Sequence, residues 1–285
     1  GRRIELPQRP TRIVAQSSAA AALWDFGVRP VGVFGPHKLK DGSPDPEVGE
    51  VDISTVESLG NVWDEFNVER YAALRPDVLI SGMYQKDTLW FVPEKSKEQI
   101  EQIAPTIGVQ LTGRSLVENI ATYEKLAAHL GADPDAAGVP AAKARFEAAV
   151  AELKRTVAEK RLKVTFITGD ADNVYFANPG NFPDVKFFTE QGLDVVVPEK
   201  PGEDGFWEAV SWENADKYEV DVIFHDARAQ SMTLAEMKAK PTFARLPAVQ
   251  AGQVYPWRAE QRYSYLGHAI SIEELTANLA KAKEL

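Results

Sequence analysis

The fold is decided by residues 139–161, VPAAKARFEAAVAELKRTVAEKR, near the middle of the chain. Ala, Glu, Lys, Arg and Leu dominate this stretch, and all of them favour the α-helix. Phe146, Val150, Leu153 and Val157 are spaced so that they form one apolar stripe along a helix. Because Asp-Pro-Asp and Gly-Val-Pro lie just upstream, the stretch predicts a single helix of about 30 Å, the width of a small domain.

Composition limits the classes of function that the chain can have. The 285 residues are 44% apolar, enough for one large domain or two lobes of ordinary size. A net charge of −10 argues against nucleic acid as a partner. The chain has no cysteine, and its four histidines are scattered. We therefore expect no disulfide, no cysteine nucleophile and no dedicated metal site.

Predicted strands and helices alternate on both sides of the central helix. Before it we predict strands at 12–14, 31–34, 77–80 and 107–111 and helices at 17–27, 68–74, 90–103 and 116–130. After it we predict strands at 163–168, 193–197, 220–225 and 254–257, a polar loop at 169–184, the end of a helix at 187–192, and helices at 212–217, 234–238 and 272–282. Such alternation is typical of a largely parallel sheet with helices on both faces.

The two sides of the central helix repeat one plan. Residues 69–80, ERYAALRPDVLI, match residues 213–224, ENADKYEVDVIF. In each copy a Glu opens a short helix, and an Asp eight residues later opens a buried strand. We therefore predict an α/β fold of two Rossmann-like lobes with mainly parallel sheets, residues 1–138 and 162–285, joined by the single helix 139–161. In such sheets ligands bind beyond the carboxyl ends of the strands, which predicts a cleft between the lobes.

Three motifs in order resemble those of the substrate-binding proteins of iron–siderophore ABC importers, the class III type with a helical backbone. They are LPQRPTRIV at 6–14, NVE with LRPDVLI within 67–80, and VSWE with DVI within 210–223. The resemblance covers nearly the whole chain. It implies a binding protein and not an enzyme, with two α/β lobes, limited hinge motion and a shallow cleft that holds a ferric chelate.

The resemblance also implies delivery of the chelate to a membrane ABC permease. One surface glutamate in each lobe would pair with permease arginines, and motif position assigns Glu69 and Glu213 to this role. The alternative is that both acids only stabilise a helix N-terminus.

The expected location is extracytoplasmic. No apolar run approaches the ~20 residues of a membrane span. Because the chain begins at Gly1, we expect that a preceding segment with any signal or lipid anchor has been removed. The resemblance therefore implies a monomer that is periplasmic or held at the cell surface as a lipoprotein.

A ferric siderophore satisfies its iron with its own oxygen atoms, so the protein needs no metal ligand and no cofactor. It needs aromatic surface and a few donors toward the chelating oxygens, at the strand ends and in the loops after them. Trp24 and Trp212 lie on predicted helices and are interpreted as packing residues. The predicted ligand contacts are Tyr84, Trp90, Arg114, Tyr175, Trp207, Arg228, Trp257 and Arg262.

Charge favours one class of siderophore. A tricatecholate complex carries several negative charges and would require many converging cations, whereas a hydroxamate complex is neutral or positive. An acidic protein with few arginines and many aromatics therefore favours a hydroxamate of the ferrioxamine type.

Three other functions stay open. A protein of the same fold could bind cobalamin, or haem with Tyr84 or Tyr175 as axial ligand. A two-lobed glycosyltransferase-like enzyme is possible, but the first strand is followed by Gln16-Ser17-Ser18 and not by a phosphate-binding glycine motif. A scaffold domain with a vestigial cleft is the third.

Overall fold

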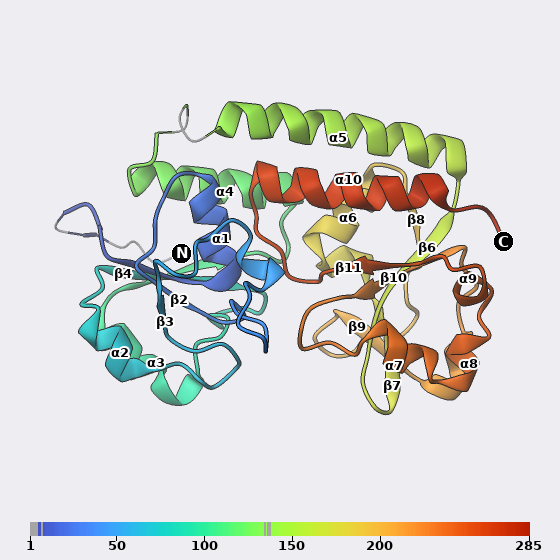
Figure 1. Ribbon diagram of the computed structural model, residues 1–285, viewed down its shortest axis with the longest axis horizontal. Coiled ribbons are helices and arrows are strands. Elements are labelled where there is room, and N and C mark those ends of the chain that lie inside the picture. The colour runs from blue at the N-terminus through green and yellow to red at the C-terminus, as the bar shows by residue number, and fades with distance from the viewer. Residues whose placement is uncertain (1–4, 7, 134, 136–137) are drawn as a thin grey trace. The chain divides into compact units, whose positions relative to one another are not determined.

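The computed structural model describes residues 5–6, 8–133, 135 and 138–285 (Figure 1). Ile4 and Pro7 of the expected N-terminal lead, and Pro134 before the central helix, lie outside the described residues. The chain divides into two compact units: unit 1 comprises Gly1–Arg145 and Gln261–His268, and unit 2 comprises Phe146–Glu260 and Ala269–Leu285. The lobe boundaries expected at residues 138 and 161 remain a prediction.

The predicted central helix is confirmed as α5, Val139–Lys160. Phe146, Leu153 and Val157 of the predicted stripe are buried, and Ala149 is buried beside them. Val150 is only half-buried. The ring of Phe146 lies 6.1 Å from that of Phe187, so the stripe packs onto the aromatic core of unit 2.

Unit 1 contains one parallel sheet with strand order β3-β2-β1-β4-β5. Its strands are β1 (Ile13–Gln16), β2 (Gly32–Phe34), β3 (Glu57–Ser58), β4 (Val78–Met83) and β5 (Thr106–Gln110). From β1 the chain continues to β2 and β3 on one side of the sheet, and from β4 it continues to β5 on the other side. The strand order therefore reverses between β1 and β4, which is where ligands bind in doubly wound sheets.

The helices of unit 1 cover this sheet (Figure 1). They are α1 (Ser17–Asp25), α2 (Val68–Ala73), α3 (Lys97–Ile103) and α4 (Leu116–His129). The helix predicted at 90–103 is too long, because Pro93 interrupts it and the α-helix begins only at Lys97. Helix α1 is capped by the side chain of Gln16, which accepts the hydrogen bond from Ala19 N–H.

Unit 2 contains a mixed sheet with strand order β11-β10-β6-β7-β9, and β8 also pairs with β6. Its strands are β6 (Lys163–Gly169), β7 (Asn173–Ala177), β8 (Asp194–Val195), β9 (Trp207–Ser211), β10 (Val222–Asp226) and β11 (Val254–Trp257). The sequence prediction missed β7 and β9. β7 lies within the segment predicted as a polar loop, and it pairs antiparallel with both β6 and β9.

The helices of unit 2 are α6 (Pro183–Glu190), α7 (Leu234–Lys238), α8 (Pro241–Ala244), α9 (Pro247–Gln250) and much of α10 (Tyr265–Lys281). The helix predicted at 212–217 is only a 3₁₀ turn at Trp212–Asn214. The helix end predicted at 187–192 belongs to α6, which begins at Pro183, a residue that suits the first turn of a helix.

The internal repeat is visible in the strand pairing. In unit 1, β1 lies between β2 and β4, and in unit 2, β6 lies between β8 and β10, with every one of these pairs parallel. The repeated aspartates make equivalent hydrogen bonds in both units. Asp77 accepts a hydrogen bond from the Arg12 N–H at 2.9 Å, and Asp221 accepts one from the Lys163 N–H at 2.8 Å. Each carboxylate thus joins the amino ends of two neighbouring strands.

Candidate functional site

The point of strand reversal in unit 1 carries a buried polar cluster. The Glu47 carboxylate accepts hydrogen bonds from Gln16 Nε2 at 2.9 Å and from Ser17 Oγ at 2.6 Å. All three residues are buried. The sequence analysis did not select Glu47, because it lies in a polar loop far from β1 along the chain.

An aromatic patch, the unit 1 patch, lies beside this cluster and consists of Trp63, Tyr84, Trp90 and Phe91. The ring of Trp90 lies 5.1 Å from that of Tyr84 and 4.9 Å from that of Trp63. Trp63 also packs on Phe91 at 4.9 Å, and its exposed fraction is 41%. The structure therefore brings together the predicted contacts Tyr84 and Trp90 and adds Trp63, which the sequence analysis missed.

Backbone conformation is unusual around the unit 1 patch. Phe91, Asp64 and Asp87 have φ angles of 59°, 67° and 60°. Left-handed conformations of this kind are rare outside glycine, and they cluster at functional sites. The backbone of Trp90 is held to β4, because Trp90 N–H donates to Gly82 O and Ser81 Oγ donates to Trp90 O. The surrounding structure thus fixes the patch in place.

The two predicted arginines in unit 1 occupy different environments. Arg114 is exposed, and its Nη1 donates to Thr122 Oγ1 at 3.2 Å. The neighbouring Thr112 Oγ1 donates to the carbonyl of Tyr84 at 3.0 Å, which places the Arg114 turn beside the unit 1 patch.

Arg262 is buried in unit 1, with its Nε 3.1 Å from Asp25 Oδ2 and its Nη2 3.7 Å from Glu50 Oε1. Its side chain fills a slot between Gly49 and Gly267, where an added Cβ would lie 1.5 Å and 2.5 Å from it. Burial raises the pKa of Asp25, and the Arg262 charge opposes that rise. The Arg262 guanidinium is therefore paired with acids of the protein itself.

A second group of aromatics, the unit 2 stack, consists of Phe182, Trp207 and Trp257. The ring of Phe182 lies 4.8 Å from that of Trp207 and 5.4 Å from that of Trp257. The two indoles are 6.3 Å apart. Phe182 and Trp257 are buried, whereas Trp207 is half-buried. The structure therefore brings together Trp257, which was predicted from the end of a strand, and Trp207, which was predicted from a loop.

Asp184 lies directly beneath this stack. Trp257 Nε1 donates to Asp184 Oδ2 at 2.7 Å. Burial raises the pKa of Asp184 to about 6, the indole hydrogen bond lowers it, and the nearby charge of Asp226 raises it further. A buried carboxylate therefore orients one of the predicted contact residues.

Arg228 is enclosed by acids. Its Nη2 lies 2.7 Å from Asp226 Oδ2, and its Nη1 donates to Glu260 Oε1. Asp226 also accepts a hydrogen bond from Ser231 Oγ at 2.6 Å. The guanidinium that was predicted to meet chelate oxygens is thus already bound to two carboxylates.

Tyr175 lies on β7 opposite Ala209, on the same face of the sheet as Trp207, which is opposite Ala177. Its hydroxyl donates to Asp170 Oδ2 at 2.6 Å. This hydrogen bond raises the pKa of Tyr175 and lowers that of Asp170. Tyr175 therefore lies near the unit 2 stack, with its hydroxyl turned toward the β6–β7 turn.

The remaining tryptophans have packing roles. Trp212 is buried in the core of unit 2, and its Nε1 donates to Asp170 O at 2.9 Å. Trp24 is only half-buried, and the Arg29 guanidinium lies 4.1 Å from its ring centroid.

The two repeat glutamates are exposed at corresponding places. Glu69 lies in the first turn of α2, and Glu213 lies in the 3₁₀ turn before β10. The pKa of Glu213 is lowered by its own backbone N–H and by Ser211. Both carboxylates are therefore available at the surface of their units.

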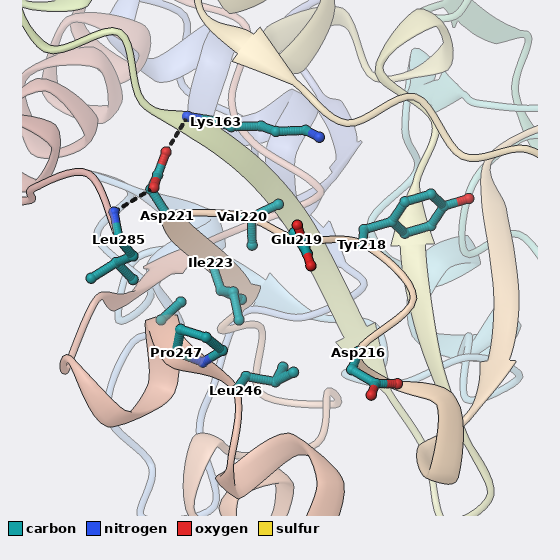
Figure 2. Close-up of a pocket in the computed structure, with 11 residues that line it drawn as sticks. Lys163, Asp216, Tyr218, Glu219, Val220, Asp221, Ile223, Leu246, Pro247 and Leu285 are labelled. Carbon is teal, nitrogen blue, oxygen red and sulfur yellow. Dashed lines mark hydrogen bonds between the residues drawn. The ribbon is translucent and has the colours of Figure 1, made fainter.

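Figure 2 shows a pocket of about 540 Å³ in unit 2, at the amino ends of β6 and β10. Asp221 binds the N–H groups of Lys163 and Leu285 in its wall, and Ile223 and Leu246 provide apolar surface. The predicted ligand contacts do not line this pocket. It also lies at the end of the strands opposite to the one where parallel sheets bind ligands.

Among the residues that the structure describes, the His, Asp and Glu side chains form no group of three or more that could hold a metal ion. Every helix formed by these residues is too short or too polar to pass through a lipid bilayer.

The known proteins that this chain resembles are binding proteins. The family described as periplasmic binding protein matches residues 16–261. DesE, a ferric-siderophore receptor protein from Streptomyces coelicolor, has a crystal structure that aligns with a TM-score of 0.94 at 37% identity, covering 99% of this chain and 96% of DesE.

Two further relatives are more distant. The Fe(3+)-citrate-binding protein YfmC of Bacillus subtilis is 23% identical over 248 residues, which is 86% of this chain and 72% of YfmC. The siderophore-binding protein FhuD from Vibrio cholerae, solved with Fe3+–Desferal bound, shares the fold with a TM-score of 0.68 at 20% identity, covering 96% of this chain and 99% of FhuD.

Proposed function

We propose, from the premise that this chain belongs to the periplasmic binding protein family, that it captures a ferric siderophore outside the cytoplasm and delivers it to an ABC permease. The observation that carries the proposal is the pair of aromatic surfaces, the unit 1 patch and the unit 2 stack. Each surface is formed by rings at strand ends or in the loops beside them. Large rings with nearby polar groups suit a bulky chelate whose iron is already coordinated.

The likeness to DesE supports this function because it extends over nearly the whole of both chains. The protein would act by binding and not by catalysis, as a monomer that releases its ligand to the permease. Exposed Glu69 and Glu213 would contact that permease. The siderophore would supply every iron ligand, and the protein would supply none.

The preferred ligand in this proposal is a hydroxamate complex of the ferrioxamine type. Arg228 is bound by Asp226 and Glu260, and Arg262 is bound by Asp25 and Glu50. A tricatecholate complex with several negative charges would require cations that are not already neutralised. A neutral or positive hydroxamate complex has no such requirement, and the net charge of −10 favours it.

The direct test is tryptophan fluorescence during titration with ferrioxamine B, with ferric enterobactin and haem in parallel. The chain has six tryptophans, and four of them belong to the two aromatic surfaces. We expect saturable quenching by ferrioxamine B below about 1 μM, a binding free energy beyond roughly −8 kcal/mol.

Matched variants assign the quenching to these surfaces. Trp63→Phe and Trp207→Phe should weaken binding. Trp24→Phe should leave the affinity unchanged, because Trp24 is part of α1 and the Arg29 guanidinium covers its ring. Preference for enterobactin would overturn the hydroxamate assignment. A response to haem alone, or to none of the three compounds, would overturn the proposed function.

A further inference from the structure

Asp184 occupies an unusual position for a carboxylate, inside the aromatic core of unit 2. It lies in the first turn of α6, directly after Phe182 and Pro183. Its exposed fraction is only 4%, and Phe182 beside it belongs to the unit 2 stack. Asp and Glu are rarely buried to this degree without a specific partner.

The partner of Asp184 is the indole of Trp257. Trp257 Nε1 lies 2.7 Å from Asp184 Oδ2, and the two residues are 73 positions apart in the chain. Both side chains are buried, so water does not compete for this hydrogen bond. A buried indole N–H without an acceptor is costly, which makes the carboxylate decisive for the orientation of the ring.

The orientation of Trp257 determines what surrounds it. Its ring packs at 5.1 Å and 71° on Phe166 of β6 and at 5.4 Å on Phe182. Trp207 lies 6.3 Å away at 62°, and it is the partly exposed member of the unit 2 stack. A rotation of Trp257 would therefore displace Trp207.

We propose that Asp184 is a positioning residue for ligand binding: through its hydrogen bond to Trp257 it sets the aromatic surface that Trp207 presents to a ferric siderophore. This inference rests on the proposed function for the identity of the ligand. The coupling itself, from Asp184 through Trp257 to Trp207, is a property of the protein without ligand.

The same contact makes the stack sensitive to pH. Burial raises the pKa of Asp184 to about 6, so its charge changes between pH 5 and 7. The charge of Asp226 acts on it and raises its pKa, and Asp226 in turn binds Arg228, which also binds Glu260. Protonation of Asp184 replaces a charge-assisted hydrogen bond by a weaker one and loosens the hold on Trp257.

The first experiment follows the near-ultraviolet circular dichroism of the protein without ligand from pH 4.5 to 8. We expect a transition near pH 6 from the coupled indoles, and its loss in Asp184→Asn. Asp221→Asn, a buried change at the opposite end of the same sheet, should keep the transition. His225→Gln should keep it as well, because His225 and Asp226 point to opposite faces of β10. An unchanged transition in Asp184→Asn would overturn the proposal.

The second experiment measures the affinity for ferrioxamine B at pH 7 in a mutant cycle. Asp184→Asn should weaken binding, because a neutral amide oxygen is a weaker acceptor for the Trp257 indole than a carboxylate. Asp184→Leu, if it folds, should weaken binding roughly tenfold, because the indole loses its acceptor. In a Trp257→Phe background the same substitutions should have no further effect. Equal losses in both backgrounds would exclude action through Trp257. If wild-type protein does not bind ferrioxamine B, the proposed function fails, while the dichroism experiment still decides the coupling.

Discussion

Arg228 brings a positive charge into a largely buried part of unit 2, where two carboxylates neutralise it. Its side chain is 16% exposed, and those of Asp226 and Glu260 are 0% and 8% exposed. In such a triad each charge depends on the others, since removing one member leaves an uncompensated charge in a low-dielectric environment. Arg228 therefore stabilises unit 2 whether or not a ligand is present.

Replacing Arg228 by Met should lower the free energy of unfolding by about 3 kcal/mol, because Asp226 and Glu260 would remain buried without their cation. Urea denaturation at pH 7 measures this change. Arg114→Met is the matched control, since Arg114 is exposed, and it should change stability by less than about 0.5 kcal/mol. Equal stability of the two variants would show that the triad contributes nothing.

His268 and Trp63 illustrate two residues whose surroundings could not be deduced from their neighbours in sequence. His268 is buried beside Tyr263, and burial with the Arg262 charge lowers its pKa to about 3. Trp63 follows the two-residue strand β3, which was not predicted, so the rule of searching at strand ends did not reach it.

At the scale of secondary structure, the repeat identified from the sequence corresponds to a repeated set of hydrogen bonds between an aspartate and the backbone. Asp77 precedes β4 and binds the backbone N–H groups of Thr11 and Arg12. Asp221 precedes β10 and binds those of Lys163 and Leu285. An aspartate at this position therefore connects the amino ends of the two central strands in each unit.

Asp77→Asn should destabilise the protein by about 1 kcal/mol at pH 7. The N–H groups of Arg12 and Thr11 hold the pKa of Asp77 below its usual value. A carboxylate with a lowered pKa contributes stability above its unfolded pKa of about 3.9, and loses it as the pH falls through the folded pKa.

The difference between wild-type and Asp77→Asn should therefore shrink in acid, as measured by urea denaturation from pH 7 down to pH 3. Asp172→Asn, in the exposed β6–β7 turn, serves as the control and should show no such pH dependence. A difference that stays constant across this range would mean that the Asp77 charge is unimportant.

Two of the strands that were not predicted, β7 and β9, share a physical cause. β7 and β9 form an antiparallel pair, with Tyr175 opposite Ala209 and Ala177 opposite Trp207. Each strand is flanked by Asp, Asn, Gly and Pro, which are typical of loops, so local composition did not distinguish them. Their conformation depends on pairing with β6 and with each other, which is a tertiary property.

At the scale of the whole molecule, the proposed docking to a membrane permease would involve the two exposed repeat glutamates. The net charge is −10, and Glu69 and Glu213 lie at corresponding places in the two units. Charge complementarity of this kind contributes to specificity and association rate more than to ligand affinity. The two functions of the protein should therefore be separable by mutation.

Glu69→Lys and Glu213→Lys should leave the affinity for ferrioxamine B within about twofold of wild-type, while each lowers stimulation of the permease ATPase roughly tenfold or more. Fluorescence titration measures the first quantity, and permease reconstituted in proteoliposomes measures the second. Glu159→Lys on the exposed face of α5 provides a control of the same charge. Normal stimulation by both variants would remove these glutamates from the docking surface.

Local sequence pattern predicted the central helix and the parallel strands at the centre of both sheets. The apolar stripe of 139–161, the alternation of strands and helices, and the matching segments 69–80 and 213–224 predicted α5 and two α/β sheets, because these features depend on residues close together in sequence. The positions of strands and loops also selected Tyr84, Trp90, Trp207 and Trp257 as surface aromatics, and the structure places Tyr84 beside Trp90 and Trp207 beside Trp257.

Tertiary structure alone decided the chemistry of the site. Asp184 meets Trp257 across 73 residues, and Arg228 meets Glu260 across 32. Whether a buried charge binds a ligand, an indole or another charge depends on which distant groups share its low-dielectric environment. Sequence spacing carries no record of those neighbours, so the partners of Asp184 and Arg228 emerged only from the folded chain.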